Sequence, residues 1–549
     1  MNRFLGFALV LLGACATGPD SGPYDLAIRG GTVVDGTGAP GFAGDVAVRG
    51  DRIVAVGRVP GTAQREIDAR GLVVSPGFID MHSHSDFLLL EDGDAQSKIR
   101  QGVTTDVLGE DSSGGPVLGK HPRVEKASWT TLGGYFDALE KSRISINAAS
   151  YVGMGTVWRC VMGDSHERPT PAQFDEMKAL IDQAMREGAS GLSSMLAVPP
   201  GLLATREDMV ALCKPVARHG GIYSTHIRNE GTEVLDAIRE AIAIGEGAGC
   251  GVDIIHLKIA EQKLWGRMGE IVAIIEAARR RGVNVQANVY PYTRGNNNLA
   301  SILPPWAHEG GTERVLARLR DPSERAKMRK DIQGGIPGWY NHYTAVGGDW
   351  KRMLVNGNLT PKNRAFEGKT VDAIFAARWP GKDGVEALYE FLLEENGSIP
   401  TIYEHHTEAD MNLAMRQPWT SIGSDGSAYA VEGPLRRGKP HPRNFGTFPR
   451  VLGVYVRERK LLPLEEAVRK MTSLNAEKIG LKDRGVLRPG AFADIAIFDA
   501  GKVIDKSTYL EPFAYNEGIE AVIVNGEVVL ERGGRHTGAR PGRVLRHGR

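Results

Sequence analysis

The middle of the 549-residue chain alternates short apolar runs with stretches whose apolar side chains recur at helical spacing. The strand-like runs are residues 102–108, 221–226, 252–256 and 283–289, and the helical stretches are residues 174–186, 233–244 and 268–280. Strands that alternate with helices of this length favour βα units, which assemble into a parallel sheet or a barrel.

The two ends of the chain have a different texture. Residues 25–65 and 493–530 consist of short β-rich runs between turns, and Asn525-Gly526 is a hairpin signal. We therefore expect a (β/α)8 TIM-like barrel over residues 76–483, with a small β-sandwich that residues 23–75 and 484–549 build together. Residues 307–366 are polar and helix-prone, which predicts a helical insertion or lid in the barrel.

Residues 1–22 read as an export signal followed by a tether. Asn2-Arg3 is followed by an apolar stretch, residues 4–12, that is too short to span a bilayer stably. The ending Leu12-Gly-Ala-Cys15 resembles the lipobox of bacterial lipoproteins, in which cleavage leaves a lipidated cysteine at the N-terminus. We expect an exported protein, periplasmic or membrane-anchored through Cys15 alone. The alternative is an ordinary secretion signal with a chance cysteine.

Charge and cysteine content exclude two classes of protein. A formal net charge of +1 gives no global basic field, so nucleic acid is not an expected partner. Beyond Cys15 the chain has Cys160, Cys213 and Cys250, an odd number that predicts no disulfide framework. We interpret these three as buried small hydrophobic residues, and a Cys160–Cys213 pair remains open.

Side chains that can bind a metal fall at the carboxyl ends of the predicted strands. They are His226, His256, the neighbours Glu110 and Asp111, Asp425, and the pair His82 and His84 in Asp-Met-His-Ser-His. Alternate residues of a strand point to the same face, so His82 and His84 can hold one ion between them. In a barrel the carboxyl ends of the strands converge on the face that carries the active site.

Several motifs resemble those of the amidohydrolase superfamily and, within it, the N-acyl-D-amino-acid deacylase (D-aminoacylase) family. The resemblance extends from about Asp25 to Leu545. The motifs are Pro76-Gly-Phe-Ile-Asp-Met-His-Ser-His84, Gln101-Gly-Val-Thr-Thr105, Gly188-Ala-Ser-Gly-Leu-Ser193, Thr225-His-Ile-Arg-Asn-Glu230, His256-Leu-Lys258, Val289-Tyr-Pro-Tyr292, Gly423-Ser-Asp-Gly426 and the run from His441 to Gly453.

The resemblance implies a metal-dependent hydrolase with one tightly bound zinc on His226 and His256. His82 and His84 would hold a second position, which in this family can be weakly occupied. Where the family often has Gly-Asn-Cys-Gly, this chain has Gly109-Glu-Asp-Ser112, so the further ligand is Glu110, favoured for its longer reach, or Asp111. Oxygen in place of thiolate remains compatible with zinc and makes manganese or iron less improbable.

The resemblance also assigns the other site residues. Asp425 would be the general acid and base. Lys258, Tyr290 and Arg443 would bind the free carboxylate of a small-molecule substrate. His441 would orient Arg443 rather than bind metal. The predicted reaction is removal of the acyl group from N-acyl-D-amino acids, or cleavage of related D-residue dipeptides.

Two departures from the family pattern concern the walls of the substrate pocket. Val198 stands where the family commonly has tyrosine, and Met154 where a histidine is usual, so the acyl preference is less determined than the reaction. The alternatives are a cyclic amidohydrolase of the hydantoinase or dihydroorotase type and a lipoprotein that uses the barrel only for binding. The first needs a carboxylated lysine on the fourth strand, and residues 189–195 contain none.

Overall fold

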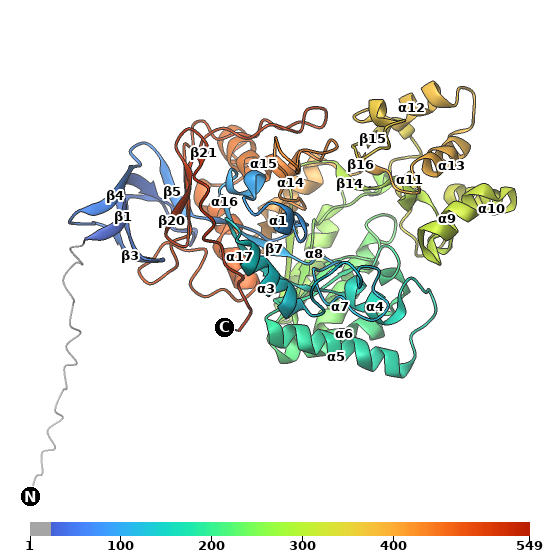
Figure 1. Cartoon of the computed structure of the whole chain (residues 1–549), viewed down its shortest axis with the longest axis horizontal. Helices are drawn as coiled ribbons and strands as arrows, with labels where there is room; N and C mark the ends of the chain where they lie inside the picture. The colour runs from blue at the N-terminus through green and yellow to red at the C-terminus, as the bar shows by residue number, and fades with distance from the viewer. Residues whose placement is uncertain (1–22, 549) are drawn as a thin grey trace, which may run out of the picture.

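The computed structural model describes residues 23–548 (Figure 1). The predicted export signal and Cys15 lie outside these residues. Within them, no helix combines the length and the apolar character that crossing a bilayer requires. Cys160 and Cys213 are buried free thiols, and Cys250 is a partly buried one, so the open Cys160–Cys213 pair is not formed.

Both ends of the chain contribute to one nine-stranded sheet. The first strands of the chain and the last lie side by side in Figure 1, because β5 pairs antiparallel with β18. The sheet order is β21-β20-β19-β18-β5-β1-β2-β3, with β4 paired to β1. Its strands are β1 (Tyr24–Val33), β2 (Phe42–Arg49), β3 (Arg52–Gly57), β4 (Ala63–Asp68), β5 (Val73–Pro76), β18 (Ile495–Phe498), β19 (Ile519–Val524), β20 (Glu527–Glu531) and β21 (Arg535–His536).

The parallel strands of the barrel fall into a three-stranded and a six-stranded sheet, ordered β6-β7-β8 and β17-β13-β12-β11-β10-β9. A single residue, Tyr151, separates β8 from β9, which joins the sheets at one side. At the other side the segments that follow β6 and β17 exchange backbone hydrogen bonds: the Asp425 amide donates to the His82 carbonyl and the His84 amide to the Gly426 carbonyl. The strands are β6 (Phe78–Asp80), β7 (Val103–Leu108), β8 (Asn147–Ser150), β9 (Val152–Gly153), β10 (Gly191–Met195), β11 (Ile222–His226), β12 (Gly251–Ile254), β13 (Val285–Val289) and β17 (Thr420–Ile422).

Amphipathic helices surround these strands. In α5 (Pro171–Glu187) a capping box between Thr170 and Gln173 satisfies the first free amides, and Gly188 ends the helix in a left-handed conformation. The others are α1 (Leu88–Glu91), α2 (Gln96–Ile99), α3 (Leu132–Ser142), α4 (Met154–Met162), α6 (Arg206–Arg218), α7 (Val234–Ala248), α8 (Met268–Arg280), α14 (Glu408–Arg416), α15 (Arg443–Arg450), α16 (Leu464–Met471) and α17 (Ser473–Lys478).

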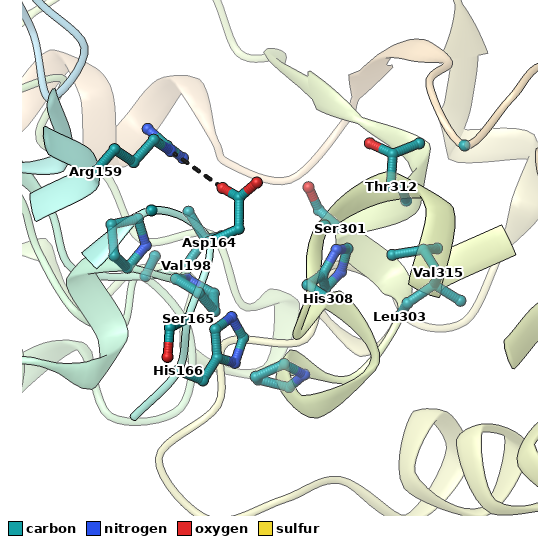
Figure 2. A pocket seen from close by; sticks show the side chains of 18 of the residues that line it. Arg159, Asp164, Ser165, His166, Val198, Ser301, Leu303, His308, Thr312 and Val315 are labelled. Atoms are coloured by element: carbon teal, nitrogen blue, oxygen red, sulfur yellow. Dashed lines mark ion pairs between the residues drawn. The ribbon is translucent and has the colours of Figure 1, made fainter. Parts of the chain in front are cut away.

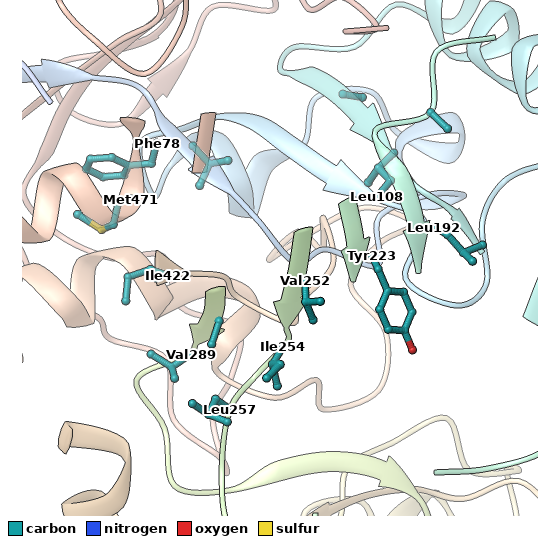
Figure 3. Close-up of a cluster of buried hydrophobic side chains, with 14 of the residues drawn as sticks. Phe78, Leu108, Leu192, Tyr223, Val252, Ile254, Leu257, Val289, Ile422 and Met471 are labelled. Carbon is teal, nitrogen blue, oxygen red and sulfur yellow. The ribbon is translucent and has the colours of Figure 1, made fainter. Parts of the chain in front are cut away.

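The barrel core is apolar and continuous. Side chains of successive strands, including Leu192, Tyr223, Val252, Ile254 and Val289, are buried in one cluster with residues of the surrounding helices (Figure 3). Burial of this many apolar side chains is the main force that holds the parallel strands in register. The expected fold class, a TIM-like barrel with a sheet formed by both chain ends, is confirmed.

The insertion is larger than the expected residues 307–366. A separate hydrophobic cluster spans Leu299 to Tyr403, and a three-stranded antiparallel sheet ordered β14-β16-β15 belongs to the same region. Sequence periodicity missed these strands because they are short and β14 is almost entirely asparagine. The elements are β14 (Gly295–Asn298), α9 (Gly311–Arg320), α10 (Pro322–Gly334), α11 (His342–Ala345), β15 (Met353–Val355), α12 (Val371–Arg378), α13 (Gly384–Glu394) and β16 (Pro400–Tyr403).

Candidate metal centre and active site

The structure places the predicted metal ligands, Asp425 and the predicted carboxylate-binding residues around one cavity of about 270 Å³ at the carboxyl ends of the barrel strands. Residues far apart in the sequence meet there because parallel strands all point their carboxyl ends to one face. The predicted residues that line the cavity are His82, His84, Glu110, Asp111, His226, His256, Lys258, Tyr290, Asp425 and Arg443.

His82, His84 and Asp425 form a first group that could hold a cation, which we call the HxH group. The two Nε2 atoms of the histidines are 3.2 Å apart, and His84 Nε2 is 3.1 Å from Asp425 Oδ1. The histidines lie just beyond β6, which ends at Asp80, and not within a strand as expected. Their rings nevertheless converge, while the side chain of His84 remains 40% exposed.

His226, Glu230 and His256 form a second group, which we call the HEH group. His226 Nε2 is 3.6 Å from Glu230 Oε2, and His256 Nδ1 is 3.2 Å from Glu230 Oε1. Glu230 is a site residue that the sequence reasoning missed. The motif Thr225-His-Ile-Arg-Asn-Glu230 contains this glutamate four residues after His226, and the segment after β11 that carries it is a loop.

Lys258 contacts two members of the HEH group, Glu230 and His256. Its Nζ donates to Glu230 Oε1 at 2.6 Å and lies 2.8 Å from His256 Nδ1. Burial alone would raise the pKa of Glu230, but His226, Lys258 and His256 hold that pKa well below its ordinary value. Lys258 therefore has a partner inside the protein, in addition to the substrate carboxylate for which it was predicted.

Glu110 and Asp111 differ in what their carboxylates contact. Oδ1 of Asp111 accepts hydrogen bonds from the backbone amides of Met195 at 3.0 Å and Gly155 at 3.2 Å. One oxygen of Glu110 accepts from Ser224 Oγ at 2.8 Å, and within residues 23–548 the other is buried without a hydrogen-bond partner. Burial raises the pKa of Glu110 well above its ordinary value.

The donor set fits a zinc ion. Glu110 Oε2 and His226 Nε2 are buried polar atoms without a hydrogen-bond partner in the described part of the chain. Burial lowers the pKa of His226 to about 3, so its ring is neutral and has a lone pair to offer. Neutral imidazole nitrogens and carboxylate oxygens are ligands that zinc accepts readily.

Arg443 and Tyr290 also line the cavity. Nη1 of Arg443 is 2.8 Å from Asp425 Oδ2, and its guanidinium lies 4.9 Å from the centre of the Tyr290 ring. Nδ1 of His441 accepts from the backbone amide of Arg443 at 3.0 Å, which anchors the start of α15. Although burial raises the pKa of Asp425, Arg443 and His82 outweigh it and hold that pKa well below its usual value. Asp425 is thus an anion.

A fully buried lysine lies beneath the HxH group. Nζ of Lys98 donates to Asp80 Oδ2 at 2.7 Å and to Ser424 Oγ at 3.1 Å, and it is 3.6 Å from Asp106. These contacts tie α2, β6 and β7 to the turn that carries Asp425, whose φ of 51° is left-handed. Such a conformation persists in a non-glycine residue only where its surroundings determine it.

Comparisons with known proteins agree with this geometry. The model of the amidohydrolase family matches residues 65–298 and 364–530. The D-aminoacylase of Alcaligenes xylosoxydans xylosoxydans is 36% identical over 536 residues, which cover 96% of this chain and 98% of the relative.

Two solved structures resemble the whole chain. A D-aminoacylase structure is 35% identical with a TM-score of 0.80, and the N-acyl-D-glutamate deacylase of Bordetella bronchiseptica, complexed with zinc and a phosphonate inhibitor, is 32% identical with a TM-score of 0.78. Each match covers 96% of this chain and 100% of the other. The chain belongs to the amidohydrolase family.

Proposed function

We propose that this protein is a zinc-dependent hydrolase that removes the acyl group from N-acyl-D-amino acids. The observation that carries the proposal is the convergence of two groups of histidine and carboxylate side chains and a buried guanidinium on one cavity. One of these groups contains the Asp425 anion. Full-length similarity to D-aminoacylase and to N-acyl-D-glutamate and N-acyl-D-aspartate deacylases supports the same reaction on a linear amide.

The metal ligands in this proposal are His226 and His256, with Glu110 as the further ligand in preference to Asp111. Glu110 has a free buried oxygen, whereas backbone amides already occupy Oδ1 of Asp111. His82 and His84 serve a second position, and Glu230 is an additional donor beside the first. Zinc bound there would polarise the amide carbonyl and lower the pKa of water.

Asp425 moves the proton in this mechanism. As an anion next to His84 and Arg443, it takes a proton from the attacking water. Protonated Asp425 then delivers the proton to the amide nitrogen, so that the amine leaves neutral. Arg443 orients Asp425 and, through its buried Nε, which has no hydrogen-bond partner within residues 23–548, has a donor free for the substrate carboxylate.

An assay of N-acetyl-D- and N-acetyl-L-amino acids with added zinc tests the function. We expect turnover of D-substrates, loss of activity with a chelator and recovery with zinc. The Asp425→Asn variant should be inactive with both series. Activity that survives chelation or this substitution would refute the mechanism, and turnover of hydantoins in preference to linear amides would favour a cyclic amidohydrolase. Zinc-dependent substrate binding without turnover would leave a binding lipoprotein.

We further propose that the protein is exported and that a lipid on Cys15 anchors it to a bacterial membrane. The support is the sequence of residues 2–15 alone. Expression with a radiolabelled fatty acid should label the wild-type protein and leave Cys15→Ser unlabelled in the soluble fraction. Secretion of unlabelled wild-type protein would instead indicate an ordinary signal peptide.

A further inference from the structure

A second cavity of about 300 Å³ lies between the barrel and the insertion. Figure 2 shows its two walls: Asp164, Ser165, His166 and Val198 belong to the barrel side, and Ser301, Leu303, His308, Thr312 and Val315 belong to the insertion. We call it the inter-domain chamber. Val198 is one of the two residues that depart from the expected family pattern.

The chamber adjoins the candidate active site. Asn297 lines both cavities, and on the barrel side Met195 lines the active site while Ala197 and Val198 line the chamber. Hydrogen bonds hold the Asn297 side chain in place: it accepts from Ser301 Oγ at 3.1 Å and lies 2.9 Å from His342 Nε2. One side chain and one short loop therefore separate the two spaces.

The chamber suits an uncharged group. Arg159 and Asp164 carry opposite fixed charges 3.9 Å apart. Burial lowers the pKa of both His166 and His308, which keeps the two rings neutral at neutral pH. The remaining walls include apolar side chains such as Val198, Leu303 and Val315. A charged occupant would find no unpaired partner among these groups.

The position of the chamber also indicates which part of the substrate would enter it. Tyr290 and Arg443 follow β13 and β17, whereas the barrel wall of the chamber follows β9 and β10, on the far side of β12 in the sheet order. A trans amide places the acyl chain and the α-carbon on opposite sides of the C–N bond. With the carboxylate held at Arg443 and the carbonyl between the metal-binding groups, the acyl chain extends away from Arg443, toward β10.

We propose that the inter-domain chamber is a subsite for the distal part of an extended, largely apolar acyl group. The preferred substrates would then be D-amino acids that carry a medium-length fatty acyl chain. The proposal rests on the deacylase function proposed above and adds the class of acyl group.

Varying the length of the acyl chain on one D-amino acid tests this proposal. The holoenzyme is assayed with N-acetyl-, N-butanoyl- and N-octanoyl-D-amino acids of one side chain. We expect the octanoyl substrate to exceed the acetyl substrate in kcat/KM. Val198→Trp and Thr312→Trp fill the chamber from opposite walls and should each lower the octanoyl-to-acetyl ratio of kcat/KM by at least about tenfold. Glu313→Trp, the exposed neighbour of Thr312 on α9, is the matched control and should keep the wild-type ratio.

The outcomes separate the two proposals. Turnover of acetyl but not octanoyl substrate by the wild-type enzyme would refute the subsite and leave the deacylase function intact. An unchanged ratio in both chamber variants, or a ratio that falls as far in Glu313→Trp, would also refute it. A shift in preference among D-amino-acid side chains at constant acyl group would assign the chamber to the side chain instead. No turnover of any N-acyl-D-amino acid would refute both proposals.

Discussion

The HxH group and the HEH group contain similar side chains, but their surroundings differ. The HxH group is open on one side, because the His84 side chain is 40% exposed, and its carboxylate pairs with Arg443. The HEH group is enclosed, and Lys258 contacts its carboxylate directly. Enclosed donors favour tight metal binding, whereas an exposed group next to a carboxylate anion favours proton transfer. We infer that the HEH group mainly holds the metal and that the HxH group mainly transfers the proton.

Replacement of Asp425 tests the proton-transfer half of this division. Asp425→Asn keeps the shape but cannot accept a proton, so kcat should fall by about 10⁴-fold, the upper end for general acid–base catalysis. Steady-state kinetics with an N-acetyl-D-amino acid measure the effect. Asp499→Asn, in a surface turn, is the control. A decrease below about tenfold would remove Asp425 from the proton transfer.

Replacement of Lys98 tests the support beneath the HxH group. Lys98→Met leaves Asp80 and Asp106 buried without their cation, which should lower the free energy of unfolding by about 3–5 kcal/mol. Urea unfolding followed by circular dichroism measures the loss. Lys141→Met, at an exposed position on α3, should change stability little. Equal stability of both variants would contradict the structural role of the buried pair.

Replacement of one histidine in each group tests the metal-binding half. His226→Asn should weaken zinc binding by more than about 100-fold, since the loss of outer contacts alone costs about 10–100-fold. His84→Asn should weaken it by about tenfold or less. Competition with a chromogenic chelator measures both affinities. The reverse order would place the tight site at the HxH group.

The pH dependence of zinc binding tests the role of Glu110. Burial raises the pKa of Glu110 in the metal-free protein, so binding must displace its proton and the affinity should rise with pH. In Glu110→Gln the slope of log affinity against pH should decrease by about one proton per zinc. Asp111→Asn should keep the wild-type slope. A lower slope in Asp111→Asn and not in Glu110→Gln would exchange the two assignments.

The local sequence was sufficient to predict much of the barrel and to recognise the family. Thr170 and Gly188 mark the ends of α5, and polar residues after apolar runs pointed to the carboxyl ends of β7, β11, β12 and β17. Recognition as an amidohydrolase is confirmed by the family match and by the full-length relatives. These features depend on residues close together in the chain, where periodicity and capping are visible.

Other features depend on contacts between distant segments. The place of Glu230 beside His256 follows from the loop after β11, and the separate contacts of Glu110 and Asp111 follow from β10 and β11 packed against them. The extent of the insertion was hidden because β14 and β16 pair across a hundred residues. The roles of the site residues stay predictions that the variants above test.

The sequence by itself determined the fold class, the family and a set of side chains whose chemistry suits zinc binding and proton transfer. These properties follow from local sequence patterns and from the chemistry of individual residues. Only the tertiary structure decided which carboxylates face the cavity, which lysine neutralises which acid, and where a second chamber opens beside Asn297. The physical reason is that charge pairing, burial and enclosed volume arise between elements and have no signature within any one of them.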